Sequence, residues 1–219
     1  MAVHGCLTSA VGRCLTVCTC TIQHHQASLA ICRDTGDRLG EAVALENLAI
    51  TWCGQGRYRE AGSQVEEALA ICIELGHRHL EANALLIRGN ILQRQAEYGQ
   101  AAAQHRRAIA LFREVGDPFY EAESRNSLGE ALCGAGSHRA ARAKHHGVLE
   151  LTRRIGARYE QARAHNGLAR SYYATESHGL ARRHWQHALT LYSSLGVPDA
   201  DVVKARLLTL PPQRRSRRP

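Results

Sequence analysis

A period of 40 residues runs through most of this chain. Three kinds of residue recur at that interval: a glycine, an alanine, and a leucine or isoleucine. The positions are Gly36, Gly76, Gly116, Gly156 and Gly196; Ala61, Ala101, Ala141 and Ala181; and Leu29, Leu69, Ile109, Leu149 and Leu189. A fixed period of this length is typical of stacked structural repeats, because each unit buries its apolar face only against the next unit. The period therefore predicts one array of repeats rather than several globular domains.

Each repeat contains the pattern of two amphipathic helices. In the unit 36–75, apolar residues recur at three- and four-residue steps over residues 39–53 and again over 58–75. Gly54-Gln55-Gly56 separates the two stretches, since glycine weakens a helix interior. Gly76 is expected to end the second helix, because glycine adopts a positive φ there without steric cost.

Small residues are expected to lie opposite large ones where the helices meet. The small positions are Ala49, Gly89, Gly129 and Ala169 in the first helices and Ala61, Ala101, Ala141 and Ala181 in the second helices. The large positions are Trp52, Leu92, Leu132 and Tyr172, together with Val65, His105, His145 and Trp185. His25, His105 and His145 share one repeat position and are predicted to be half-buried packing residues.

The repeat resembles the tetratricopeptide repeat (TPR). The residues that carry the resemblance are Leu48-Ala49, Trp52, Gly56-Arg57-Tyr58, Ala61 and Ala68, and it extends over about residues 21–208. The period of 40 residues is longer than the usual 34 of that family. The resemblance implies an all-α fold, a right-handed α-α superhelix of about four and a half helix-turn-helix repeats with a C-terminal capping helix.

The repeat pattern divides the chain into three parts. The expected parts are an irregular N-terminal segment, 1–20; the TPR array, 21–208; and a disordered basic tail, 209–219. Within the array we expect a half repeat, 21–35; full repeats at 36–75, 76–115, 116–155 and 156–195; and a capping helix, 199–208.

A second resemblance is confined to the C-terminal part. Residues 160–173 and 181–207 are similar to the closing repeats of actinobacterial antibiotic-regulatory transcriptional regulators, of the type with an NB-ARC ATPase domain. Members of that family carry a DNA-binding domain and the ATPase domain ahead of their TPRs. Neither activity is carried over, because this sequence contains no residues that match those domains.

Composition favours a soluble protein of a reducing compartment. The net charge is +8, but Arg214, Arg215, Arg217 and Arg218 lie in the tail, so the array itself is only mildly basic. Direct binding to nucleic acid is therefore not expected. The eight cysteines are not arranged as a disulfide framework, and no run of 18 apolar residues predicts a membrane helix. We expect a cytoplasmic location.

The sequence contains no motif of an enzyme. It has no phosphate-binding loop, no nucleophile elbow and no His-Glu-x-x-His pair. We therefore expect no catalytic residues, no cofactor and no metal.

Two clusters of metal-ligating residue types remain to be considered. Thiolate and imidazole groups are a zinc set, and they gather at Cys14, Cys18, Cys20, His24 and His25, at a spacing that matches no known zinc finger. The alternative for this cluster is an irregular start of the chain. His178, His184 and His187 form a second group, for which packing is the alternative.

The expected function is therefore the binding of a protein or peptide partner in the concave groove that the first helices line. Mapping the TPR groove positions onto this sequence gives polar and apolar candidates along the first helices. They are Glu46, Ile50, Asn90, Arg94, Asn126, Glu130, Asn166, Arg170 and Tyr173. Arg163 and Arg170 make one end of this face basic. A bacterial regulatory role is expected from the resemblance, and the alternative is a truncated sensor fragment of a multidomain transcriptional regulator.

Overall fold

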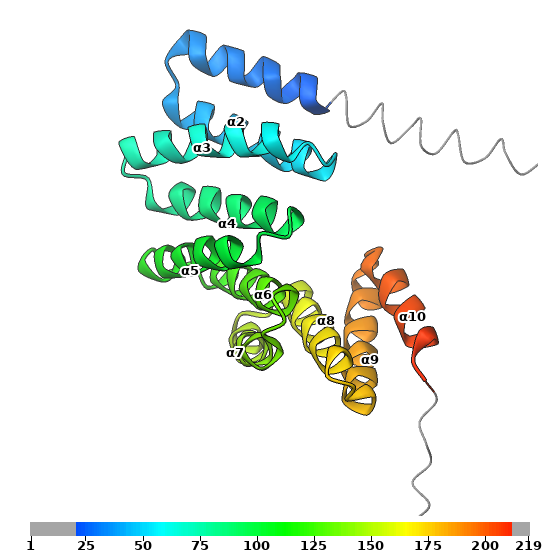
Figure 1. The fold of residues 1–219 in the computed structure, drawn as a ribbon. Coiled ribbons are helices and arrows are strands. Elements are labelled where there is room, and N and C mark those ends of the chain that lie inside the picture. The colour runs from blue at the N-terminus through cyan, green and yellow to red at the C-terminus, as the bar shows by residue number, and fades with distance from the viewer. Residues whose placement is uncertain (1–20, 212–219) are drawn as a thin grey trace, which may run out of the picture. The chain divides into compact units, whose positions relative to one another are not determined.

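The computed structural model describes residues 21–211, and within that range it contains helices and turns but no strand (Figure 1). Residues 21–35 are helical. The helices that follow are α2 (Arg38–Gly54), α3 (Tyr58–Glu74), α4 (Arg78–Arg94), α5 (Tyr98–Glu114), α6 (Pro118–Gly134), α7 (His138–Ile155), α8 (Arg158–Ala174), α9 (His178–Leu195) and α10 (Asp199–Thr209). The predicted all-α class and the predicted pair of helices per repeat are confirmed.

The chain forms two compact units, which divide between Gln95 and Ala96. In the first unit, α2 packs against α3, α3 against α4, and α2 also against α4. In the second unit, consecutive helices from α5 to α10 pack in sequence, and α6 also packs against α8. Because the turns inside each repeat are short, paired helices run antiparallel, as in a TPR-like helical stack.

Local signals explain where the helices begin and end. Asp37 accepts a hydrogen bond from the Gly40 backbone N–H at 2.9 Å and so caps α2. Asp117 caps α6 in the same way, by accepting from the Phe119 and Tyr120 backbone N–H groups. The glycines of the 40-residue period all have a positive φ: Gly36, Gly76, Gly116, Gly156 and Gly196 at 73°, 64°, 73°, 72° and 67°. This confirms their predicted role after the second helices.

The predicted pairing of small with large residues is found at His145. The imidazole lies so close to α6 and α8 that a Cβ added to Gly129 would come within 2.6 Å of the ring, and one added to Gly167 would overlap it. His145 and His105 are fully buried, with no exposed surface, rather than half-buried as the sequence suggested. Both rings are accommodated because the facing helices carry glycine or alanine.

The last helix, α10, extends one residue beyond the predicted capping helix. Its Val203 is buried and packs in a cluster with Trp185 and Tyr192 of α9. None of the described helices is long and apolar enough to cross a lipid bilayer. The predictions for residues 1–20 and for the basic tail beyond Pro211 lie outside the described residues.

Candidate functional site

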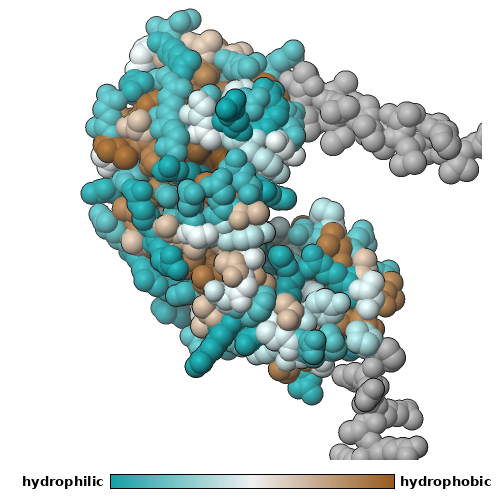
Figure 2. All heavy atoms as spheres, viewed as in Figure 1, coloured by the Kyte–Doolittle hydropathy of each residue, from teal (hydrophilic) through white to brown (hydrophobic). Residues whose placement is uncertain are grey.

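The described surface seen in Figure 2 is mostly hydrophilic, with hydrophobic residues scattered among polar ones. The large exposed apolar side chains, such as Ile31, Ile50 and Leu208, come from separate helices. We therefore searched for a site among cavities and buried polar groups, where function more often lies than at single exposed apolar residues.

In the first unit, the predicted groove residues lie in different environments. Glu46 on α2 is buried and accepts a hydrogen bond from Asn83 Nδ2 at 2.8 Å, while its Oε1 atom has no partner among the described residues. Burial raises the pKa of Glu46 to about 7. Ile50 is 52% exposed, Asn90 is half-buried and Arg94 is exposed.

In the second unit, Asn126 on α6 is part of a buried hydrogen-bond network. Its Nδ2 donates to the Glu160 backbone carbonyl at 2.9 Å and to Glu160 Oε2 at 2.8 Å. Its Oδ1 lies 3.0 Å from His145 Nδ1, and because an amide oxygen only accepts, His145 Nδ1 is the donor. Burial lowers the pKa of His145 to about 4, so the ring is neutral at pH 7.

Arg163 on α8 joins this network to α6. Its guanidinium donates to Glu130 Oε1 at 3.0 Å, to Glu160 Oε2 at 3.2 Å and to Ser127 Oγ at 3.3 Å. Burial alone would lower the pKa of Arg163, but Glu130 and Glu160 raise it above its usual value. Burial alone would raise the pKa of Glu130, and Arg163 holds it below its usual value instead. Each buried charge in this network is therefore compensated by an opposite one.

Asn166 plays the part that Asn126 plays one repeat earlier. Its Oδ1 accepts a hydrogen bond from Trp185 Nε1 at 3.0 Å. Asn126 and His145 are separated by 19 residues in the sequence, and so are Asn166 and Trp185. In both repeats an asparagine of the first helix fixes an aromatic side chain of the second helix.

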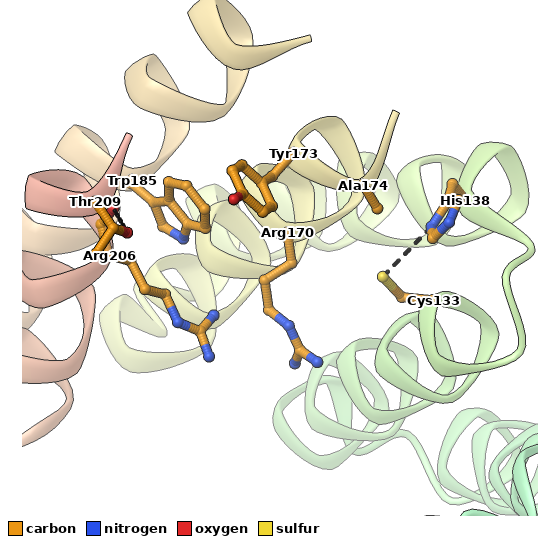
Figure 3. A pocket seen from close by; sticks show the side chains of 8 residues that line it. All are labelled: Cys133, His138, Arg170, Tyr173, Ala174, Trp185, Arg206 and Thr209. Atoms are coloured by element: carbon orange, nitrogen blue, oxygen red, sulfur yellow. Dashed lines mark hydrogen bonds between the residues drawn. The ribbon is translucent and has the colours of Figure 1, made fainter. Parts of the chain in front are cut away.

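A cavity of about 360 Å³ opens in the second unit between the ends of several helices (Figure 3). We call it the α8–α10 cavity. It is lined by Cys133, His138, Arg170, Tyr173, Ala174, Trp185, Arg206 and Thr209. The aromatic rings of Tyr173 and Trp185 form one wall, with centroids 5.6 Å apart. Two predicted groove residues, Arg170 and Tyr173, therefore meet here.

The two arginines of the α8–α10 cavity lack acidic partners. Figure 3 shows the Arg170 and Arg206 side chains extending in the same direction, with their guanidinium groups ending near each other. No ion pair or side-chain hydrogen bond joins either of them to another residue in the range 21–211. Burial and then the charge of Arg170 lower the pKa of Arg206. A site with two uncompensated cations beside aromatic rings favours an anionic ligand.

The sequence did not point to Arg206, because α10 follows the last 40-residue unit and has no equivalent in the other repeats. Arg163, expected at the basic end of the groove, is already paired with Glu130 and Glu160. Asn126, Glu130 and Asn166 likewise make bonds inside the second unit. Of the predicted groove residues in this unit, Arg170 and Tyr173 are the two that remain exposed.

The histidine group was also considered as a metal site. His165 Nδ1 and His184 Nδ1 lie 3.0 Å apart, and the His187 ring stacks on His165. Among residues 21–211, however, no three His, Cys, Asp or Glu side chains are placed to hold a metal ion. The other candidate cluster, from Cys14 to His25, lies mostly outside the described residues.

Comparison with known proteins supports the fold. Residues 53–114 match the family model of the tetratricopeptide repeat. No curated protein sequence matches the chain. Among solved structures, BtubC from P. vanneervenii is similar with a TM-score of 0.67 and 18% identity, over 92% of this chain and 96% of that one.

Two further structures belong to signalling proteins. One is a STAND ATPase with a tetratricopeptide-repeat sensor from Pyrococcus horikoshii, with a TM-score of 0.67 and 13% identity over 78% of this chain and 27% of that one. The other is a Rap protein complexed with Competence and Sporulation Factor, with a TM-score of 0.64 and 15% identity over 85% of this chain and 57% of that one. At these identities the likeness shows the fold alone, which is that of a TPR-like helical repeat.

Proposed function

We propose that this tetratricopeptide-repeat protein is a non-catalytic binding module, which takes a peptide or a segment of a partner protein on the first-helix side of its second unit. The observation that carries the proposal is the α8–α10 cavity. Its exposed lining residues Arg170 and Tyr173 come from a first helix, α8, at positions where TPR proteins meet their ligands. The Rap protein with a similar fold was crystallised with a factor bound, which supports the same use of the fold.

The chemistry of the cavity supports binding rather than catalysis. Cys133 Sγ lies 3.6 Å from His138 Nδ1, a pairing that in some enzymes activates a thiol. Here burial raises the pKa of Cys133, so the thiol remains protonated at pH 7. A protonated thiol is a poor nucleophile. The Cys133–His138 pair is therefore best explained as part of the cavity wall.

The second candidate function is the sensor part of a multidomain transcriptional regulator in bacteria. It is supported by the similarity to the tetratricopeptide-repeat sensor of the STAND ATPase, of which the chain spans about a quarter. The resemblance of residues 160–173 and 181–207 to the closing repeats of actinobacterial regulators supports it further. Sequencing the genomic region upstream of the Met1 codon tests this alternative, since an in-frame ATPase domain would be expected there.

The binding function can be tested by selecting peptides against the immobilised full chain from a random peptide display library. We expect enriched peptides whose affinity falls at least about tenfold, or 1.4 kcal/mol, in the double variant Arg170→Ala/Tyr173→Ala. Arg183→Ala is the matched control, because Arg183 is also an exposed arginine but lies on α9 outside the cavity lining. Enriched peptides that bind the double variant as well as the wild type would contradict the proposal, and so would a selection that enriches none.

A further inference from the structure

We propose that the α8–α10 cavity recognises a carboxylate group of the bound peptide, held between the guanidinium groups of Arg170 and Arg206. The proposal rests on the proposed binding function and specifies its ligand. It assigns the site to the junction of α8, α9 and α10, rather than to the row of first-helix positions that the repeat pattern predicted.

The first argument is the charge balance inside the second unit. Arg163, Arg113 and Arg125 all form ion pairs with glutamates, at N–O distances between 2.5 and 3.0 Å for the closest pair of each. Arg170 and Arg206 form none within the described part of the chain, although they face one cavity. Two like charges in a partly desolvated space repel each other. A bound anion removes this repulsion and replaces the hydration that Arg206 has lost.

The second argument is that Arg206 is held in place. Val203 is buried against α9. Arg182 on α9 also donates through Nη2 to the backbone carbonyls of Leu210 and Pro211, at 3.4 and 3.0 Å. These contacts fix the C-terminal end of α10 next to α9. The planar guanidinium of Arg206 is therefore presented from a fixed helix, which reduces the entropy lost on binding.

The third argument concerns the rest of the ligand. Tyr173, Ala174 and Trp185 give the cavity an apolar side next to the two cations. Trp185 is only 3% exposed and is oriented by its hydrogen bond to Asn166. A free inorganic anion would leave this aromatic wall without a contact. A peptide carboxylate next to an apolar side chain would use both parts, and a cavity of about 360 Å³ has room for one or two side chains.

A carboxylate on a peptide has two sources, an Asp or Glu side chain and the C-terminus. Both have the same planar geometry, which a guanidinium binds through two parallel hydrogen bonds. The test therefore uses four synthetic probes on the full chain. They are Ac-Gly-Leu-Asp-Leu-Gly-NH2 and its Asn twin, and Ac-Gly-Gly-Leu with a free C-terminal acid and its C-terminal amide.

Trp185 provides the signal for these titrations. The chain has two tryptophans, so Trp52→Phe leaves Trp185 in the cavity wall as the sole indole. We expect at least one acidic probe to change its fluorescence and to bind at least about tenfold more tightly than its neutral twin. Arg206→Gln and Arg170→Gln should each weaken that probe at least about tenfold, and Arg206→Lys, which keeps the charge but loses the planar fork, should weaken it less. Arg183→Gln should leave the affinity unchanged within about twofold.

Each outcome decides the question. Tighter binding of one acidic probe, with loss in both arginine variants of intact helicity by circular dichroism, supports the proposal and identifies the source of the carboxylate. Equal binding of acidic and neutral probes overturns it, as does an unchanged affinity in Arg206→Gln. Inorganic phosphate that competes at the same concentration as the acidic probe also overturns it, because a phosphate site would then be the better description. Peptides from the display selection that bind the cavity without an acidic group would sink this proposal alone and leave the binding function standing.

Discussion

Arg163 and Arg170 lie on the same helix, two turns apart, in opposite electrostatic environments. The guanidinium of Arg163 is bonded to Glu130, Glu160 and Ser127. Arg170 shares a cavity with a second arginine, Arg206, and neither has an acidic partner among the described residues. The same residue type in the same helix thus has two roles: Arg163 holds α8 to α6, whereas Arg170 is available to a ligand.

The difference follows from what each charge has lost and gained on folding. Removing a charge from water costs several kcal/mol, and a buried ion pair regains this only when its hydrogen bonds are complete. Arg163 meets that condition. The cavity arginines do not, and the lowered pKa of Arg206 records the uncompensated part of the cost. A neutral replacement is therefore expected to be harmful at Arg163 and nearly harmless to stability at Arg206.

The largest effect is expected for Arg163→Met. The substitution leaves Glu130 and Glu160 in a buried position without their cation, which should lower the free energy of unfolding by about 3–5 kcal/mol. Urea unfolding followed by far-ultraviolet circular dichroism measures this. Adding Glu130→Gln and Glu160→Gln to the same chain should recover part of the loss, because these changes remove the unpaired charges. A loss below about 1 kcal/mol in the single variant would show that the network contributes little.

Glu46 offers the same comparison from the side of the acid. It is buried in the first unit without a cation, and its pKa rises from 4.5 in an unfolded chain to about 7. Between these values the folded chain holds more protons than the unfolded chain, so this group's contribution to stability is present at low pH and is lost as pH rises towards 7. The loss amounts to about 3 kcal/mol at 1.36 kcal/mol per pKa unit.

The measurement for Glu46 is the free energy of unfolding of wild type and Glu46→Gln at pH 5 and pH 7.5. We expect the variant to gain stability relative to wild type as the pH rises, since glutamine carries no charge and can still accept from Asn83. Glu130→Gln should show the opposite trend, because Arg163 lowers the pKa of Glu130 and its stabilisation is lost at acid pH. A difference between wild type and Glu46→Gln that does not change with pH would contradict the prediction.

The sequence predicted the helices well because the 40-residue period records how they pack. Small residues such as Gly129 and large ones such as His145 recur at fixed positions, since each helix must fit its neighbour. The same period was a weaker guide to the candidate site. Asn126 and Asn166 occupy groove positions in the pattern, yet in the structure each hydrogen-bonds an aromatic residue 19 positions later. Buried polar rings require such partners, and the sequence shows only that both residue types are present.

The cavity could not be predicted from the period, because the repeat pattern stops before α10. Arg206 has no equivalent residue in an earlier repeat, and its approach to Arg170 depends on how α10 packs on α9. That packing is set by Val203 and by the hydrogen bonds of Arg182 to the end of α10. These contacts join segments that are 20 or more residues apart, and such contacts are visible only in the folded chain.

The smallest effect is expected for Arg206→Met, and it completes the comparison with Arg163→Met. A methionine keeps the apolar stem of the side chain in place and removes a cation that has no partner, so the free energy of unfolding should stay within about 1 kcal/mol of the wild-type value or rise slightly. The same urea series measures it, with Arg183→Met as the control for an exposed arginine on α9. If Arg206→Met destabilised the chain as strongly as Arg163→Met, Arg206 would be a structural residue, and its unpaired charge would no longer be a reason to expect a carboxylate in the cavity.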